Sequence, residues 1–210
     1  MYRSLYRMLQ VTSIANALTR PVSLLHTPTF IERNARNKFI SISPGGLAGF
    51  YMLGIVTYIR EHYDTSSFQI IGASAGAWNT LPMVYKGSIH DVVQDISCNY
   101  DHTENENEDD VGSIYQLQQN IQHLITTHYN EDDFDLHRVN IATTGLTTTG
   151  FEQLIICDIS TLRQATECCI ASSHIPFITG KVHKINDKLL FDGGFQKFPP
   201  EELGDHLNIT

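Results

Sequence analysis

From residue 38 onward, short apolar segments alternate with helix-length segments, and glycine-rich turns join them. KFISIS (38–43) ends at Pro-Gly-Gly, GFYMLGIVTYIREHY (49–63) follows at helical length, and SFQIIG (67–72) is the next apolar segment. Strands and helices that alternate with short joints form a parallel sheet covered by helices, because each helical crossover returns the chain to the same end of the sheet. We therefore expect an α/β fold with a mainly parallel sheet between helices. The 210 residues are enough for one such domain with a sizeable core.

The rest of the chain predicts further elements of both kinds. The expected elements are a helix that opens at Ser74 and kinks or ends near Pro82, a solvated acidic loop (101–110), a helix (113–129), a strand, turn and strand (138–150), another strand (153–160), a helix with a Thr or Ser cap (161–177) that Pro176 stops, and a hairpin (181–194) that turns at Asn186-Asp187.

Charge is distributed unevenly along the chain. Residues 1–38 hold six Lys or Arg and one acidic residue, whereas the remainder holds eight basic and 22 acidic residues. An acidic body repels phosphate, so nucleic acid is excluded as a partner. Residues 1–31 contain no acid and many Ser and Thr, which is typical of an organelle transit peptide or of a basic helix on a membrane surface. We therefore divide the chain into a basic extension (1–37) and a domain (38–210).

The stretch IIGASAGAW (70–78) places Ser74 between two small residues and two glycines. An apolar segment precedes it and a helical segment follows, which is the context of a serine nucleophile on a sharp strand-to-helix turn. Glycines at 72 and 76 permit such a turn. A plain turn between a strand and a helix remains the alternative.

Two other glycine-rich turns follow apolar segments. In SPGGLAG (43–49), successive free amides can hold an oxyanion, and a phosphate-binding loop is the competing interpretation. In FDGG (191–194), a carboxylate lies in a tight turn, which alone indicates no more than an ordinary Asp-Gly turn.

Together, SPGGLAG, GASAGAW and FDGG resemble the patatin-like phospholipase family, and most closely its eukaryotic triglyceride-lipase branch. The resemblance runs from about Lys38 to Pro199 and includes IREH, IATTGLTTTG and ASSHIPF. It implies a three-layer α/β domain with a Ser–Asp dyad and no histidine as base. Carried over by motif, Ser74 is the nucleophile, Asp192 is the base, and the amides around Gly45, Gly46 and Leu47 form the oxyanion hole; the motif glycines are Gly49, Gly72, Gly76, Gly193 and Gly194.

The resemblance also implies a function and its surroundings. We expect hydrolysis of lipid esters, either phospholipids or acylglycerols, through an acyl-enzyme, with no metal and no cofactor. Contact with a membrane or lipid droplet follows from that substrate class, and we expect an intracellular protein, or an organellar one if residues 1–31 are a transit peptide. Two departures concern the oxyanion loop: Pro44 replaces the usual first glycine and has no N–H to donate, and Ala48 stands where many members carry Arg or Lys.

Two other functions compete with this one. An α/β-hydrolase triad needs an acid and then a histidine after the serine, and Asp158 with His174, His183 or His206 satisfies that order. Such a triad would leave SPGGLAG and FDGG without roles. A non-catalytic lipid-binding protein on the same fold is the other alternative, because a fold does not guarantee activity.

Overall fold

The computed structural model describes residues 21–101, 112–176, 178–179, 183–203 and 206–210. Its strands are β1 (Ser23–His26), β2 (Lys38–Ile42), β3 (Phe68–Ala73), β4 (Val139–Thr147), β5 (Gly150–Cys157), β6 (His183–Ile185), β7 (Lys188–Phe191) and β8 (His206–Ile209). Its α-helices are α2 (Thr27–Arg33), α3 (Gly49–His62), α4 (Ala75–Val84), α5 (Ile89–Asp101), α6 (Gly112–His128) and α7 (Leu162–Ser172). Short 3₁₀ turns are η1 (Gly46–Ala48), η2 (Glu131–Asp133), η3 (Leu136–Arg138), η4 (Gly193–Phe195) and η5 (Glu201–Leu203).

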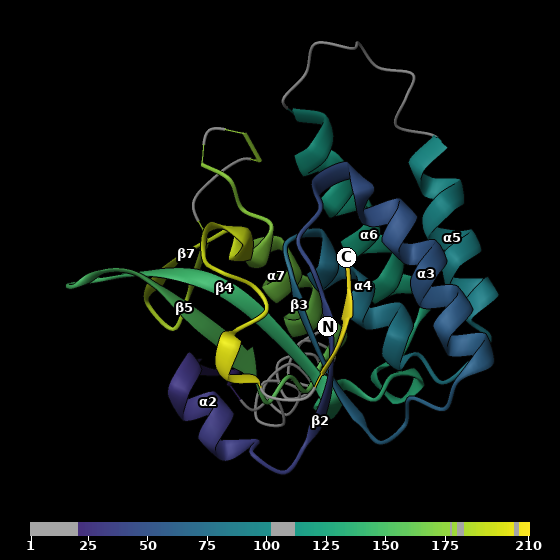
Figure 1. Cartoon of the computed structure of the whole chain (residues 1–210). Coiled ribbons are helices and arrows are strands. Elements are labelled where there is room, and N and C mark those ends of the chain that lie inside the picture. The colour runs from purple at the N-terminus through teal and green to yellow at the C-terminus, as the bar shows by residue number, and fades with distance from the viewer. Residues whose placement is uncertain (1–20, 102–111, 177, 180–182, 204–205) are drawn as a thin grey trace, which may run out of the picture.

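The described strands form one mixed sheet in the order β1-β5-β4-β3-β2-β8, with the β6–β7 hairpin attached to β4 (Figure 1). Strands β8, β2, β3 and β4 pair in parallel. Strands β5 and β7 are each antiparallel to β4. Strand β1 is antiparallel to β5, and β6 is antiparallel to β7. Six of the eight described strands therefore share one direction, and the expected α/β fold with a mostly parallel, helix-flanked sheet is confirmed.

The two faces of the sheet are covered unequally. On β2, Ile40 and Ile42 face a large core under α3, α4, α5, α6 and α7, whereas Phe39 faces a smaller core under α2 and η5. Figure 1 shows α3, α4, α5 and α6 gathered on one side of the sheet and α2 on the other. In the part of the chain that the structure describes, helices thus lie on both sides of the sheet, and the layer on the second side is thinner.

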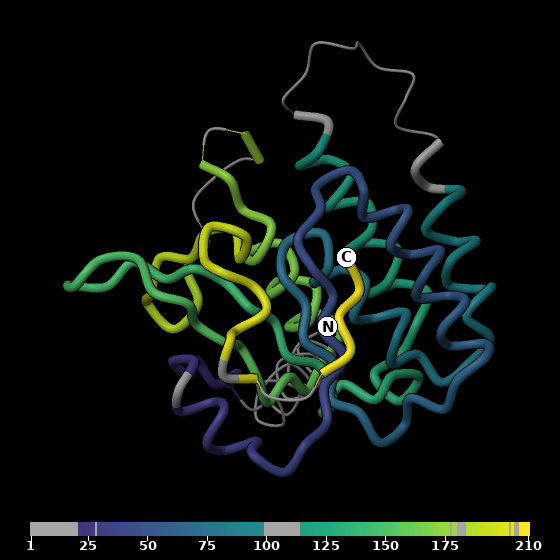
Figure 2. The backbone as a smooth tube through the Cα atoms, viewed as in Figure 1, coloured from purple at the N-terminus to yellow at the C-terminus, as the bar shows by residue number. Residues whose placement is uncertain are grey.

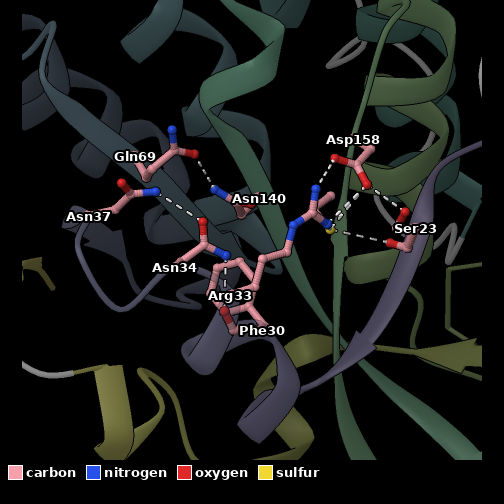
Figure 3. Close-up of polar contacts among 9 residues, drawn as sticks. Ser23, Phe30, Arg33, Asn34, Asn37, Gln69, Asn140 and Asp158 are labelled. Atoms are coloured by element: carbon pink, nitrogen blue, oxygen red, sulfur yellow. Dashed lines mark hydrogen bonds and ion pairs between the residues drawn. The ribbon is translucent and has the colours of Figure 1, made fainter.

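The first described residues belong to the domain. Strand β1 pairs with β5, and Phe30 of α2 is fully buried with its ring centroid 5.7 Å from that of Phe39. Asp158, which follows β5, accepts hydrogen bonds from Ser23 Oγ and from both terminal nitrogens of Arg33, as Figure 3 shows. Residues 23–33, which the expected boundary after residue 37 assigned to the extension, therefore belong to the domain, because β1 pairs in the sheet and α2 covers its second face. The predicted transit peptide or surface helix falls mainly on residues 1–20, which lie outside the described residues.

Local turn and cap signals in the sequence are confirmed. Thr161 caps α7, since its Oγ1 accepts from the Gln164 amide at 3.1 Å while the Gln164 side chain accepts from the Thr161 amide. The β6–β7 hairpin turns at Asn186 and Asp187, both with positive φ, as a two-residue hairpin turn of the primed type requires. The expected helix after Ser74 continues through Pro82 and ends two residues later.

Other boundaries differ from the sequence prediction. Residues 138–150 do not hold two complete strands: β4 runs unbroken for nine residues, and its residues 141–147 pair with β5, which begins at Gly150. Helix α7 ends at Ser172, four residues before Pro176, because the chain turns there toward the end of β7. Helix α5 and strand β8 were not foreseen, and Figure 2 shows β8 lying beside β2 although about 165 residues separate them in the chain. The predicted acidic loop lies almost entirely outside the described residues.

Candidate active site

Strand β4 offers one edge to two strands that approach each other end to end. Residues 139–142 pair with parallel β3, and residues 144–145 pair with antiparallel β7, while β5 occupies the other edge. The ends of β3 and β7 therefore meet at the level of Thr143. Ser74 directly follows β3 and Asp192 directly follows β7. The topology thus brings together two residues that are 118 positions apart in the chain.

Ser74 occupies a strained turn between β3 and α4. Its φ of 54° and ψ of −124° lie outside the helical region, so α4 begins at Ala75 and not at Ser74. A non-glycine residue held at positive φ costs free energy, and such strain gathers at functional sites. Ser74 is 8 % exposed, and its hydroxyl donates a hydrogen bond of 2.6 Å to Asp192 Oδ2. The serine is therefore both raised out of the helix and paired with a carboxylate.

Asp192 is held from several sides. Its Oδ1 accepts from the Gly194 amide at 2.6 Å, its own amide donates to the His174 carbonyl, and its carbonyl accepts from Thr144 Oγ1. The residue is 5 % exposed, and this burial raises the pKa of its carboxyl group, against the opposing effect of the hydrogen bonds from Ser74 and Gly194. Desolvation of this kind moves a carboxylate toward the range of a working general base.

Because the pKa of Asp192 is raised in the folded state, ionisation of this group opposes folding. Its stabilising contribution is present below the pKa of the unfolded chain, about 3.9, and is lost as pH rises through the higher folded value. We therefore expect the Tm of Asp192→Asn minus the Tm of the wild type to increase as the pH is raised from 4 to 8. The measurement is thermal unfolding followed by circular dichroism.

Asp64→Asn is the matched control, because hydrogen bonds from Ser66 lower the pKa of the Asp64 carboxyl group. Its Tm difference from the wild type should change with pH in the opposite direction. A constant difference for Asp192→Asn over this range would contradict the assigned shift.

Two motif glycines allow α4 to lie close to the strand ends. A Cβ atom on Gly76 would lie 2.1 Å from the Ile42 carbonyl oxygen, and one on Gly72 would lie 2.4 Å from the Gly76 carbonyl oxygen. Gly193 has the same role beside β4, since its Cβ would lie 2.3 Å from the Ala142 carbonyl oxygen. These glycines are needed for close backbone approach, and the loops around Ser74 and Asp192 depend on them.

The loop SPGGLAG forms η1 at the start of α3. Its first helical hydrogen bond runs from the Ala48 amide to the Gly45 carbonyl at 3.0 Å, so the amides of Gly46 and Leu47 precede the helical pattern. Gly46, with φ of 53°, and Leu47 line the same cavity as Ser74. Gly45 is absent from that lining and lies against the side chain of Met52. Two of the three expected oxyanion residues therefore line the same cavity as Ser74.

The other two motif glycines connect this loop to its surroundings. A Cβ on Gly49 would lie 3.0 Å from that of Ala75, so the start of α3 packs directly on the start of α4. A Cβ on Gly194 would lie 3.1 Å from that of Pro44, which places the FDGG turn against the oxyanion loop. Pro44 thus contributes packing between the two loops where it cannot contribute an N–H.

A cavity of about 230 Å³ opens beside Ser74 and Asp192. Its wall is mostly apolar and is formed by α3, α4, α5, α6 and the segment after α7. The apolar side chains that line it are Leu47, Phe50, Leu53, Ala75, Trp78, Pro82, Ile96, Ile114, Leu117, Ile121 and Ile175. A cavity with this lining suits a hydrocarbon chain.

The residues of the alternative triad are arranged differently. In the register of the sheet, Asp158 lies beside Val139 of β4 and Ser74 lies beside Thr143 of β4. These two positions on β4 are about 13 Å apart along the strand, so Asp158 is far from Ser74. Asp158 forms an ion pair with Arg33. His174 is 1 % exposed and offers its backbone carbonyl to the Asp192 amide.

Sequence reasoning missed the residues that hold the backbone of Ser74. The Ser74 amide donates to Ser172 Oγ at 2.9 Å, and Ser172 Oγ donates to the Ala142 carbonyl. Ser173 Oγ lies 3.2 Å from the Ser74 carbonyl and accepts from Trp78 Nε1. The sequence offered two adjacent serines and nothing that linked them to Ser74, which is about 100 residues away in the chain.

No protein-family model matches the chain, and no curated protein matches it. Within the described residues, no group of three or more His, Cys, Asp or Glu side chains is placed to hold a metal ion. None of the described helices has both the length and the apolar character needed to cross a membrane. The resemblance to patatin-like phospholipases therefore remains a prediction that the motifs carry.

Proposed function

We propose that this protein is a serine acyl hydrolase that cleaves the carboxylic ester bonds of lipids, either phospholipids or acylglycerols. The observation that carries the proposal is the hydrogen bond of 2.6 Å between Ser74 Oγ and Asp192 Oδ2, beside an apolar cavity. A serine paired with a buried carboxylate can be deprotonated as it attacks, without a histidine.

In the first half of the reaction, Ser74 Oγ attacks the ester carbonyl carbon while Asp192 takes the hydroxyl proton. The carbonyl oxygen becomes an oxyanion, which the amides of Gly46 and Leu47 stabilise. The ester C–O bond then breaks, the alcohol leaves with the proton from Asp192, and the acyl group stays on Ser74.

In the second half, a water molecule attacks the acyl-enzyme. Asp192 takes a proton from the water and returns a proton to Ser74 Oγ when the acyl–serine bond breaks. The product is a fatty acid. The raised pKa of Asp192 suits both halves, because the group must accept and release a proton within one cycle.

The test is product analysis on a mixed lipid extract, with Ser74→Ala protein as the blank. Release of fatty acid by the wild type alone supports the proposal, and the accompanying alcohol product identifies the lipid class. Equal release by the two proteins would overturn it.

One observation favours a second candidate, a non-catalytic lipid-binding protein. Pro44 has no N–H at the start of the oxyanion loop, which reduces the number of donors available there. For this candidate, we expect lipids to be retained by the protein without any release of fatty acid.

A lipid substrate requires contact with a membrane or lipid droplet, and an apolar surface lies beside the cavity. Leu47 lines the cavity and is 69 % exposed, and Tyr51, the third residue of α3, is 71 % exposed. We propose that these side chains enter the lipid surface, together with the basic segment that precedes residue 21. Aromatic side chains are favoured at such interfaces because one end is apolar and the other polar.

We therefore expect Tyr51→Ser to weaken binding to phosphatidylcholine vesicles about 5- to 10-fold, since one partly inserted aromatic ring is lost. The measurement is vesicle co-sedimentation. Tyr63→Ser is the matched control, because Tyr63 is 62 % exposed but lies at the opposite end of α3, about 18 Å away. Equal loss in both variants would contradict a contact centred on the cavity.

A further inference from the structure

The cavity-facing stripe of α6 contains one polar residue. Ile114, Leu117, Gln118 and Ile121 all line the cavity, at the spacing i, i+3, i+4, i+7 that marks one face of a helix. Gln118 therefore occupies a position at which the pattern calls for an apolar side chain. A polar residue on a buried stripe costs stability unless it is hydrogen-bonded.

Among the described residues, Gln118 Oε1 has no hydrogen-bond partner, although the side chain is only 6 % exposed. One turn later on the same helix, Gln122 donates to Thr166 Oγ1 at 3.0 Å. Gln118 Oε1 therefore lacks a partner because it lies beside the cavity, whereas a glutamine elsewhere on the same helix is hydrogen-bonded.

The other polar side chains of the cavity wall already have partners in the protein. Ser74 pairs with Asp192, Asn79 donates to the carbonyls of Gly49 and Ala75, Ser173 accepts from Trp78, and Thr179 accepts from the Ile175 amide. Among the described residues of the cavity wall, Gln118 has a buried polar atom, Oε1, without a protein partner, and a ligand in the cavity can supply that partner.

We propose that Gln118 makes the cavity selective for an ester that carries a hydroxyl group on the arm inside the cavity. This inference rests on the proposed function, because Ser74 and Gln118 then contact the same substrate. The cavity volume equals roughly eight water-sized groups, which corresponds to a chain of medium length. The hydroxyl belongs either to the acyl chain or to the alcohol, and the amide pairs with it in both cases.

Gln118→Met removes the amide and keeps an unbranched side chain of similar size. Gln116→Met is the matched control, because Gln116 is exposed on the same helix and bonds to Asn120. The acyl arm compares kcat/KM for methyl octanoate with a series of methyl hydroxyoctanoates whose hydroxyl moves along the chain. The alcohol arm compares octyl octanoate with octanoyl esters of octanediols.

In one of the two substrate series, the wild type and Gln116→Met should have a kcat/KM about 10-fold higher for the hydroxylated ester than for the plain ester, as expected for one hydrogen bond in a buried site. Gln118→Met should lose that preference while it still hydrolyses the plain ester, and its Tm should not fall below that of the wild type. The inference is overturned if the wild type prefers the hydroxylated ester in neither substrate series, or if Gln118→Met keeps that preference. Gln118→Leu provides the same comparison if Gln118→Met does not fold.

Binding separates this inference from the proposed function. Calorimetry with Ser74→Ala protein should show about 10-fold tighter binding of the preferred methyl hydroxyoctanoate or octanediol ester than of the plain ester, and Ser74→Ala/Gln118→Met should not. If no ester is hydrolysed but this difference is present, the proposed function fails and the role of Gln118 stands. If esters are hydrolysed and Gln118 makes no difference to binding or rate, this inference alone fails.

Discussion

Ser74→Ala is expected to reduce the hydrolysis of p-nitrophenyl butyrate at least 10⁴-fold, to the background rate, because the attacking oxygen is removed; this is on the order of the loss seen for other serine hydrolases. Asp192→Asn is expected to reduce it about 10²- to 10⁴-fold, because an amide cannot take the hydroxyl proton that the carboxylate accepts over 2.6 Å. The measurement is kcat/KM at pH 8. Mass spectrometry after treatment with a fluorophosphonate should show the label on Ser74 in the wild type.

Ser173→Ala and His206→Ala are the controls for this prediction. Ser173 lines the same cavity and bonds to Trp78 and to the backbone carbonyl of Ser74, and His206 belongs to the alternative triad. Both variants should keep kcat/KM within about 10-fold of the wild type, since neither residue reacts with the ester. Unchanged rates in Ser74→Ala and Asp192→Asn would refute the enzyme function, and an inactive His206→Ala beside an active Asp192→Asn would favour the triad.

Gly76→Ala is expected to destabilise the protein by more than about 4 kcal/mol, so that it does not fold at 37 °C. Its Cβ would lie 2.1 Å from the Ile42 carbonyl oxygen, and this neighbour is strand backbone that cannot move aside. The measurement is the free energy of unfolding from urea titration.

Gly54→Ala is the matched control, because Gly54 is an exposed residue inside α3 with nothing within 4 Å of its Cβ position. Alanine at this position should stabilise the helix by about 0.5–1 kcal/mol. Wild-type stability in Gly76→Ala would show that β2 and α4 do not need this close contact.

Local chemistry explains which elements were predictable. The Thr161 cap and the Asn186-Asp187 turn depend on residues within three positions of one another, so the sequence alone identifies them. Helix α5 has such a signal in Ser88 and Asp91, a serine cap with an acid three residues later, and it was overlooked. Strand β8 has none: it is a four-residue edge strand whose partner is β2, about 165 residues earlier. A strand of that length is defined by its partner more than by its own residues.

The candidate site divides in the same way. Glycines around Ser74 and after Asp192 could be found in the sequence because backbone approach requires them at fixed spacings. The serines at 172 and 173 and the amide of Gln118 could not, since their roles depend on what lies opposite them.

The sequence by itself therefore determined the α/β class and the turn that carries Ser74, whereas Asp192 as its partner was implied by the resemblance of the motifs to a known family. Only the tertiary structure decided that these two side chains meet, because β4 offers one edge to β3 and then to β7. It also decided that β1 and α2 belong to the domain and that an unpaired amide lines the cavity. Turns and caps depend on neighbouring residues in the chain, whereas strand pairing and cavity lining depend on residues that only folding brings together.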